Sequence, residues 1–327
     1  MLQVLLVYSS IKVRCLLQVS ICVITYNRPL GLRRLLEGIR QLQFTRIPQP
    51  TIETIVVDND NKGLAKEICT EFSDRLPGKL VCGVEPQRGI SYARNKAVSL
   101  ASPESDFIAI IDDDEVPTPY WLEELLLTQA QHSADVVAGR VVSRMPDQTP
   151  DWIVRGGFFR HKSRPTGTLR HVAYTNNVLV KGEVIRSLDR VFDLRFALTG
   201  GEDSELFSRL HRLGHKIVWC NEAVVEEWVS PTRLNLKYIL TRGYRSRSTY
   251  SLLEQELNSA FSSRIVRMLK GVTLVFIGLM QLILALPQGK HKIANSLLSV
   301  YHGFGTCAGV LKIANYQLYK KSFAVAE

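Results

Sequence analysis

Phe107–Glu115 reads FIAIIDDDE, in which five apolar residues run without interruption into four acidic ones. An unalternated apolar run is typical of a strand that is buried on both faces of a sheet. The four carboxylates repel one another, so they favour a compensating cation. Mg²⁺ and Mn²⁺ prefer oxygen ligands and are commonly held by one or two carboxylates together with substrate phosphates. We therefore expect a buried strand that ends at a divalent-metal site, with a merely solvated acidic turn as the alternative.

Two strand-like runs nearer the N-terminus also end in polar residues. Val19–Ile24 (VSICVI) is followed by Thr25-Tyr26-Asn27-Arg28, and Thr54–Val57 is followed by Asp58-Asn59-Asp60-Asn61. Apolar residues at helical spacing in Leu30–Leu42 separate the two runs. This alternation predicts an α/β fold with a mostly parallel sheet covered by helices on both faces. Because ligands bind beyond the carboxyl ends of such strands, we expect the polar groups to form one site.

The rest of the chain continues the same pattern to about residue 230 and then changes. Strand-like sequence occurs at Leu80–Val84, Val136–Val142, Tyr174–Val180, Ile217–Cys220 and Ala223–Glu227, and helix-like sequence at 62–72, 90–101 and Ser204–Leu213. Residues 144–170 are basic and irregular, and we find no internal repeat. We predict an N-terminal extension (1–18), an α/β domain (19–232) and a C-terminal region (233–327). The extension lacks the basic start and cleavage site of a signal peptide.

A second acidic pair, Glu202-Asp203, follows two glycines at the start of the predicted helix Ser204–Leu213. Acidic residues in a first helical turn favour the helix dipole, so helix capping is a structural alternative. The glycines allow a close backbone approach that turns these carboxylates toward a ligand. A carboxylate in such a place can remove a hydroxyl proton as a general base, and Asp203 is our candidate.

Five segments, in this order, resemble the motifs of glycosyltransferase family 2. They are VSICVITYNRP (19–29), IVVDND (55–60), GISYARNKA (89–97), IAIIDDDE (108–115) and GGEDSELFSRLHRLG (200–214). The resemblance covers about residues 19–230 and implies the Rossmann-like GT-A fold and inverting transfer of a sugar from a nucleotide-diphosphate donor. Within the family, the chain is similar to bacterial enzymes that extend exopolysaccharide or lipopolysaccharide repeat units on a lipid carrier.

The resemblance also implies roles for individual residues. Those expected to bind the nucleotide-sugar are Thr25, Tyr26, Asn27, Arg28, Asp58, Arg94, Asn95, Asp112 and Asp113. The D-x-D pattern implies that Asp114 and Asp112 hold Mn²⁺ or Mg²⁺. Glu202 and Asp203 match the acceptor-side motif, whose aspartate is the expected catalytic base.

One family motif is missing from the sequence. Processive members carry Q-x-x-R-W, which this chain lacks, so we expect a single sugar to be transferred at each encounter. The basic run RGYRSR (242–247) includes Arg245, which we expect to stabilise the charge of the leaving diphosphate. A solvated helix face is the alternative for this run.

The C-terminal region carries the whole net charge of +10. Residues 233–327 hold 13 Lys and Arg against 3 Asp and Glu, whereas residues 1–232 hold 28 of each. Two apolar stretches, Gly271–Leu286 and Ser296–Leu311, have basic residues at both ends. The first is shorter than the roughly 20 residues that span a bilayer, and the charges disfavour a crossing hairpin. We expect helices that lie in, or dip into, the cytoplasmic face of the inner membrane; a spanning hairpin and a soluble subdomain are the alternatives.

Other classes of protein fit the sequence less well. Zinc-finger spacing and interleaved aromatic and basic residues are missing, so we expect no nucleic-acid partner. The six cysteines (Cys15, Cys22, Cys69, Cys82, Cys220 and Cys307) form no C-x-x-C pair and are expected to be reduced, buried thiols. A nucleotidyltransferase and a non-catalytic carbohydrate-binding protein are the alternative functions. The first would need a glycine-rich loop in place of Tyr26-Asn27-Arg28-Pro29.

We predict an inverting glycosyltransferase that moves a single hexose from a nucleotide-diphosphate sugar, expected to be a UDP-sugar. The expected acceptor is a hydroxyl of a lipid-linked glycan in bacterial surface polysaccharide synthesis, reached from the cytoplasmic membrane surface. The sequence names neither the sugar nor the linkage, because acceptor pockets are built from loops such as 144–170.

Overall fold

The computed structural model describes residues 17–60, 63–257 and 260–313. The described residues divide into a first unit within 17–144 and 161–228 and a second unit within 145–160 and 229–313. Residues 1–16, which include Cys15 and most of the predicted extension, lie outside the described residues. The predicted boundary at residue 232 stays a prediction, close to the division between the units after Trp228.

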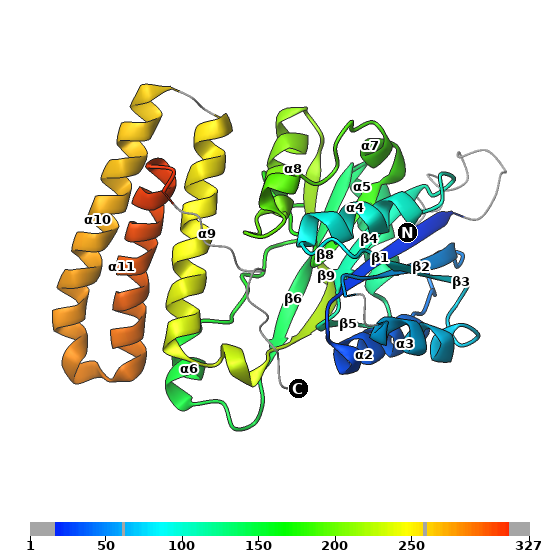
Figure 1. The fold of residues 1–327 in the computed structure, drawn as a ribbon, viewed down its shortest axis with the longest axis horizontal. Coiled ribbons are helices and arrows are strands. Elements are labelled where there is room, and N and C mark those ends of the chain that lie inside the picture. Colours follow the sequence, from blue (N-terminus) through cyan, green and yellow to red (C-terminus); the bar gives the residue numbers. More distant parts are fainter. Residues whose placement is uncertain (1–16, 61–62, 258–259, 314–327) are drawn as a thin grey trace. The chain divides into compact units, whose positions relative to one another are not determined.

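The first unit is built on one mixed sheet with helices on both faces (Figure 1). Its strands are β1 (Gln18–Thr25), β2 (Thr51–Asp58), β3 (Lys79–Val84), β4 (Phe107–Asp112), β5 (Glu115–Pro117), β6 (Val136–Arg144), β7 (Leu169–Arg170), β8 (Asn177–Lys181) and β9 (Ile217–Trp228). Its helices are α2 (Pro29–Arg40), α3 (Leu64–Phe72), α4 (Ile90–Leu100), α5 (Trp121–His132), α7 (Gly182–Arg186) and α8 (Glu202–Arg212), with the 3₁₀ turn η1 (Leu194–Phe196). The strand order is β3-β2-β1-β4-β8-β6-β9-β5, and β7 pairs with β9. The predicted α/β class is confirmed.

The N-terminal half of the sheet is parallel. β1 lies between β2 and β4, and β3 pairs with the outer side of β2. The register places Thr25 opposite Asp58 and Ile24 opposite Asp112. The polar ends of three strands therefore come out side by side at one edge of the sheet.

The other half of the sheet is mixed. β8 runs antiparallel to both β4 and β6, and β9 runs parallel to β6. The short strand β5 begins directly after the acidic turn and runs antiparallel to β9, with Glu115 opposite Glu227. The end of β9 therefore joins the acidic edge that β4 begins.

β9 is one continuous strand, whereas we predicted two short ones at Ile217–Cys220 and Ala223–Glu227. Gly139 of β6 pairs with Cys220 and Arg140 pairs with Val224, so the register shifts between them. The polar residues between the two predicted strands are extra residues of β9 that have no partner in β6, as in a β-bulge. They interrupt the pairing locally but do not end the strand.

A buried amide, Asn177, fills the irregularity. Its Nδ2 donates to the carbonyl oxygens of Arg140 and Ala223, at 2.9 Å each. Its Oδ1 accepts a hydrogen bond of 2.8 Å from the indole Nε1 of Trp121. A Cβ on Gly139 would clash with this amide, which explains the glycine. These bonds satisfy a polar group that would be costly to bury alone.

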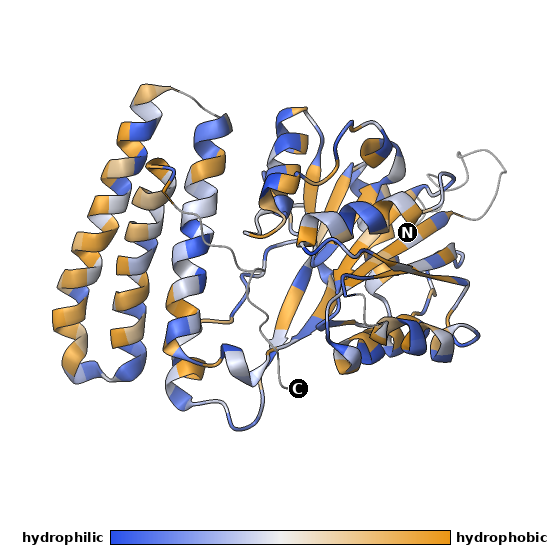
Figure 2. Ribbon diagram, in the orientation of Figure 1, coloured by the Kyte–Doolittle hydropathy of each residue, from blue (hydrophilic) through white to orange (hydrophobic). Residues whose placement is uncertain are grey.

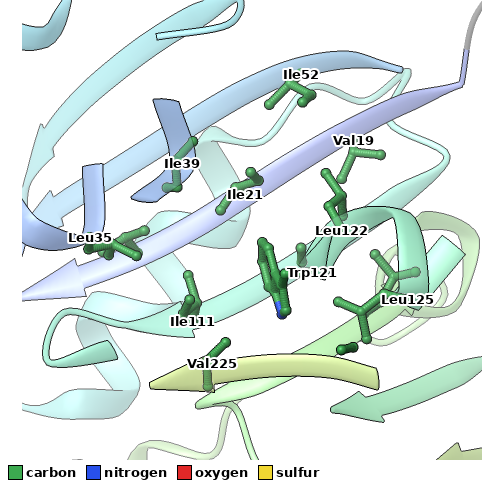
Figure 3. Packing of buried hydrophobic residues seen from close by; sticks show 14 of the residues in the cluster. Val19, Ile21, Leu35, Ile39, Ile52, Ile111, Trp121, Leu122, Leu125 and Val225 are labelled. Atoms are coloured by element: carbon green, nitrogen blue, oxygen red, sulfur yellow. The ribbon is translucent and has the colours of Figure 1, made fainter. Parts of the chain in front are cut away.

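Two apolar layers hold the sheet between its helices. Residues of α2, α3 and α5 pack on one face, and residues of α4, α7 and α8 pack on the other. Figure 3 shows the first layer, where Ile21 of β1, Leu35 of α2 and Trp121 of α5 are gathered. All three side chains are fully buried, and such burial contributes about 1.5–3 kcal/mol for each large apolar side chain. The layers therefore fix the strands whose ends form the polar edge.

The second unit is helical. It contains α6 (Asp151–Gly156), η2 (Pro231–Arg233), α9 (Leu236–Leu257), α10 (Phe261–Ala285), η3 (Leu286–Gln288) and α11 (Lys290–Val310). α11 packs along both α9 and α10. The region 144–170, predicted to be irregular, contains α6, and Phe159 beyond it stacks on Tyr238 of α9 with ring centroids 6.5 Å apart.

The two predicted apolar stretches of the C-terminal region differ in exposure. Among the described residues, one helix, Phe261–Gln288, is long and apolar enough to cross a membrane. Figure 2 shows that α10 is hydrophobic along most of its length. The second stretch, Ser296–Leu311, forms most of α11, and most of its residues are buried or partly buried, with Tyr301, Phe304 and Leu311 exposed. The larger exposed apolar surface belongs to α10.

Candidate active site

The acidic turn after β4 is tied to the loop after β1. Asp113 accepts hydrogen bonds of 2.8 Å from Thr25 Oγ1 and from Arg28 Nη1. The same Arg28 nitrogen lies 3.1 Å from Asp114. A Cβ on Gly31 would lie 2.6 Å from the carbonyl oxygen of Asp113, so a glycine is needed for α2 to approach the turn. Asp113 is therefore a buried anchor of the turn, and its predicted contact with the donor stays a prediction.

Burial raises the pKa values of three carboxyl groups in and next to the turn, Asp112, Asp113 and Glu115. Burial and the neighbouring carboxylates raise the pKa of Asp112 to about 6, against the opposing effect of Arg94. Burial also raises the pKa of Asp113, which Arg28 opposes, and it raises the pKa of Glu115 well above its usual value. Such a concentration of acidic groups is stabilised by a cation.

Arg94 of α4 connects the turn with the second acidic pair. Its side chain is 4% exposed; Nη2 lies 2.9 Å from Asp112, and Nη1 lies 3.5 Å from Glu202. The segments that carry these residues are distant in sequence, but the fold gathers them around one guanidinium. The structure thus brings together three residues that we predicted for the site, from three different motifs.

Glu202 and Asp203 begin α8. The preceding Gly200 and Gly201 have φ values of 74° and 101°, a left-handed conformation that favours glycine. The Gly201 N-cap makes no side-chain capping bond, and Asp203 accepts a hydrogen bond from the neighbouring N–H of Ser204. Burial raises the pKa of Glu202 to about 7 and also raises that of Asp203, while Arg94 lowers both. A carboxylate of raised pKa is a stronger base near neutral pH.

Asn95 holds the segment that leads to α8. Its Nδ2 donates to the carbonyl oxygen of Phe192 at 2.8 Å, and its Oδ1 accepts from the N–H of Phe192 at 3.0 Å. Ser91 Oγ, one turn earlier on α4, donates to the carbonyl oxygen of Asp193 at 2.9 Å. Asn95 therefore holds the backbone of Phe192 in the segment before α8, and its predicted contact with the nucleotide stays a prediction.

Four of the predicted nucleotide-binding residues line a small hollow at the ends of β1 and β2. Thr25, Asn27, Arg28 and Asp58 contribute to its wall. Asp58 is buried and accepts hydrogen bonds from the N–H groups of Asp60 and Ala65 at 3.0 and 3.2 Å. Burial raises its pKa.

Beside this hollow, the guanidinium of Arg88 lies over the ring of Tyr26, 4.7 Å from its centroid. Asn59 ties the loop that carries Arg88 to the end of β2, because it donates to Glu85 and Gln87 and accepts from the N–H of Gly89 at 2.9 Å. We did not predict Arg88 or Asn59 for the site. Asn59 follows Asp58 in the polar strand end, which was the available signal.

Three further residues at the edge were not among our predicted site residues. Asn176 Nδ2 donates to Glu115 Oε1 at 3.0 Å. Glu227 accepts a hydrogen bond of 3.1 Å from Ser143, and its Oε2 lies 3.4 Å from His161 Nε2. Glu115 belongs to the acidic run in the sequence, whereas Asn176 and Glu227 reach the edge only through strand register.

The oxygen ligands of the acidic turn fit a hard divalent ion. In the part of the chain that the structure describes, His, Cys, Asp and Glu form no group of three or more that could hold a metal. Asp112 and Asp114 supply carboxylate oxygens, and Mg²⁺ is commonly held by one or two carboxylates with phosphate and water completing its shell. Arg245, the last predicted site residue, lies on α9 of the second unit, and its role stays a prediction.

The sequence matches a family model and several curated proteins. The model of the family described as glycosyl transferase family 2 matches residues 20–190. The chain is 32% identical over 244 residues to the succinoglycan biosynthesis protein ExoM of Rhizobium meliloti (strain 1021), covering 73% of this chain and 76% of ExoM.

Solved structures share the fold at low sequence identity. The mannosyltransferase PcManGT from Pyrobaculum calidifontis, in complex with GDP-Man and Mn²⁺, superposes with a TM-score of 0.60 at 16% identity, over 96% of this chain and 95% of that one. S. aureus TarS 1–349 in complex with UDP-GlcNAc superposes with a TM-score of 0.53 at 14% identity, over 87% and 90%. The predicted GT-A fold is confirmed, and these relatives bind nucleotide-sugars.

Proposed function

Because the chain belongs to glycosyl transferase family 2 and is a glycosyltransferase, we propose that it transfers one hexose from a UDP-sugar to a hydroxyl of a glycan acceptor with inversion. The family membership removes the need for the nucleotidyltransferase and carbohydrate-binding alternatives. ExoM is named for succinoglycan biosynthesis, which supports a role in bacterial surface polysaccharide synthesis.

One observation carries the proposal: Arg94 lies between Asp112 of the acidic turn and Glu202 of the pair that begins α8. The turn belongs to the donor side and the pair to the acceptor side. A guanidinium between them keeps the buried Glu202 and the partly exposed Asp112 close without direct repulsion. In this proposal, the donor binds by the turn and the acceptor by the pair, which supports displacement at a sugar carbon.

In this proposal, the donor binds at the ends of β1, β2 and β4. Its base and ribose lie by the hollow that Thr25, Asn27, Arg28 and Asp58 line, and Tyr26 of the same loop is a further proposed contact. Asp114 and Asp112 would hold Mn²⁺ or Mg²⁺, which neutralises the charge of the diphosphate when bound. PcManGT was solved with Mn²⁺ and its nucleotide-sugar, which supports this assignment.

Asp203 is the proposed base. It takes the proton of the acceptor hydroxyl, while the hydroxyl oxygen forms the new bond to the sugar carbon and the bond to the leaving diphosphate breaks. Glu202, buried against Arg94, holds the base at the required place. Attack from the face opposite the leaving group gives a β linkage from an α-linked donor.

The proposed acceptor is linked to a lipid, and the proposed location is the cytoplasmic face of the inner membrane. The apolar helix Phe261–Gln288 and the basic balance of residues 233–327 support both. A lipid-linked acceptor is confined to the membrane surface, so attachment of the enzyme there raises its effective concentration.

The test is nucleotide release from a panel of UDP-, GDP- and dTDP-sugars, with and without Mn²⁺, using the full chain extracted from membranes. We expect metal-dependent release from one UDP-sugar and none from the Asp203→Asn variant, which should still bind the donor. Release from a GDP-sugar would correct the donor. If no nucleotide-sugar is bound or turned over, the proposed reaction is wrong.

A further inference from the structure

α10 presents a broad apolar face that no described part of its own unit covers. Six large side chains, Val272, Phe276, Leu279, Met280, Ile283 and Leu284, are between 45% and 67% exposed. At 100° per residue, they lie on one half of the helix surface. Exposing such a face to water is unfavourable, because removing apolar surface from water stabilises a protein by about 25 cal/mol for each Å².

The opposite face of α10 is lined with small residues. Gly271 and Gly278 are buried against α11, where a Cβ on Gly278 would lie 2.8 Å from the backbone nitrogen of Val300. A Cβ on Gly303 of α11 would lie 2.5 Å from the carbonyl oxygen of Gly271. The two backbones therefore touch. Close packing through small residues, with large apolar residues left outside, is typical of helices whose solvent is lipid.

The buried positions between α9 and α11 are also polar. Ser248, Ser251, Gln255 and Thr306 are almost fully buried. Gln255 Nε2 donates to the carbonyl oxygen of Gly309 at 3.0 Å, and Thr306 Oγ1 donates to that of His302 at 2.8 Å. The contact between α10 and α11 is thus built from small residues, and buried polar groups lie between α9 and α11. The large apolar side chains of α10 lie outside, which is the reverse of the pattern of a helix that packs into a water-soluble bundle.

Cations stand at both ends of the apolar face. Arg264 and Lys270 lie at its start, and Lys290 and Lys292 lie beyond its end. A helix that crossed the bilayer would carry one of these sets to the far side, which the distribution of basic residues in membrane proteins disfavours. Anionic headgroups of one leaflet complement both sets at once.

We propose that α10 lies in the plane of one anionic leaflet, with its apolar face among the acyl chains and α11 packed behind it. The inference rests on the membrane location proposed above and adds which surface binds and in which orientation. α11 is then the internal support of α10 and makes no second membrane segment, although its sequence is also apolar.

Flotation with vesicles of phosphatidylglycerol and phosphatidylcholine tests the surface. The variant Phe276→Glu/Ile283→Glu places two charges on the face, and the control Leu169→Glu/Leu213→Glu places two charges at equally exposed positions of the first unit. We expect the α10 variant to bind at least about tenfold more weakly and the control to bind as the unaltered chain does. Equal binding by both variants would overturn the proposal. Circular dichroism and donor binding check that each variant is folded.

The orientation is tested with single cysteines at the two ends of α10, Ser262→Cys and Gln288→Cys, in a chain without its native cysteines. Protein bound to the outside of vesicles is treated with a maleimide that does not cross membranes. Labelling of both positions is expected for a helix in one leaflet. Protection of Gln288→Cys would show a spanning hairpin and overturn the orientation.

A second copy of the chain is the other candidate occupant of this face. Sedimentation without lipid measures the oligomeric state and separates the two occupants. If Phe276→Glu/Ile283→Glu dissociates a dimer while its flotation with vesicles is unchanged, the face binds another copy and the proposal fails. Flotation needs no sugar transfer. A chain that floats as expected but turns over no donor would therefore refute the proposed function and leave this inference standing.

Discussion

In the first unit, the fully buried side chains are large, among them Trp121, Phe192 and Phe207, whereas α10 of the second unit buries Gly271 and Gly278 and exposes its large residues. The first arrangement draws its stability from removing apolar surface from water. The second removes little apolar surface and relies on close backbone contact. The two regions are therefore held together in different ways, as the proposed membrane surface of α10 requires, and each region should respond to substitution by its own rules.

The largest expected effect is on catalysis and is confined to the first unit. Asp203→Asn removes the proposed base, so turnover of the identified donor should fall about 10²- to 10⁴-fold while donor binding is kept. Asp189→Asn, an exposed change in the same unit, is the control. Steady-state nucleotide release measures both. Full activity in the Asn variant would remove Asp203 from the mechanism.

The second prediction compares the stability that is lost when a buried arginine and an exposed arginine are each replaced by alanine. Arg94→Ala leaves Asp112 and Glu202 without their partner, which should lower the free energy of unfolding by about 3 kcal/mol or more. Arg155→Ala breaks a pair with Asp151 in which both side chains are exposed, in α6 of the second unit, and should cost about 1 kcal/mol or less. Thermal unfolding of the two variants gives the comparison. Equal losses would mean that Arg94 is not the centre of a buried cluster.

A pH-dependent difference is expected for Glu202→Gln. The carboxyl has a pKa near 4.5 when unfolded and about 7 when folded, so between these values the unaltered protein loses stability as the pH rises. The glutamine variant should be up to roughly 3 kcal/mol more stable at pH 8 and equally stable near pH 4. Denaturant unfolding at both pH values measures this, with the exposed Glu183→Gln as control. A gain that is the same at both pH values would contradict the raised pKa.

The smallest expected effect is a loss of stability in the second unit, and it tests whether close backbone contact holds α10 and α11 together. Gly303→Leu inserts a side chain where α10 and α11 touch and should destabilise the unit by about 1–3 kcal/mol. Phe304→Leu changes the next residue, which is half exposed, and should have little effect. Unfolding in detergent micelles compares them. If Gly303→Leu is as stable as Phe304→Leu, close backbone contact is not what holds the helices together.

Strands that are buried on both faces of the sheet could be predicted from the sequence. β1 and β4 agree closely with their predicted runs, because a strand buried on both faces carries a continuous apolar signal. Helix α5 was not predicted. Its Glu123 is fully buried and accepts hydrogen bonds from the N–H groups of Thr45 and Arg46, so a charged residue stands where the apolar pattern needs a core position.

The residues of the site could be found, but not how they contact one another. Motifs pointed to Arg94, Asp112 and Glu202 separately, and their meeting depends on strand register and on the path of the chain before α8. Likewise, Thr25 and Arg28 were predicted as donor contacts, while the structure shows that both bind Asp113. Hydrogen-bond partners distant in sequence leave no local pattern, which is why these pairings could not be predicted.

The Asn177 amide has a consequence for the order in which the chain folds. Its three hydrogen bonds reach Trp121, Arg140 and Ala223, so they form only after four separate segments have met. The pairings of β1 with β2 and of β2 with β3 join residues that are closer in sequence than any of these bonds, and contacts between nearer neighbours form faster. We expect β1, β2 and β3 to pair first and the sheet to lock at Asn177 late. During synthesis, a ribosome-bound chain would then assemble its nucleotide hollow well before β9 completes the opposite side.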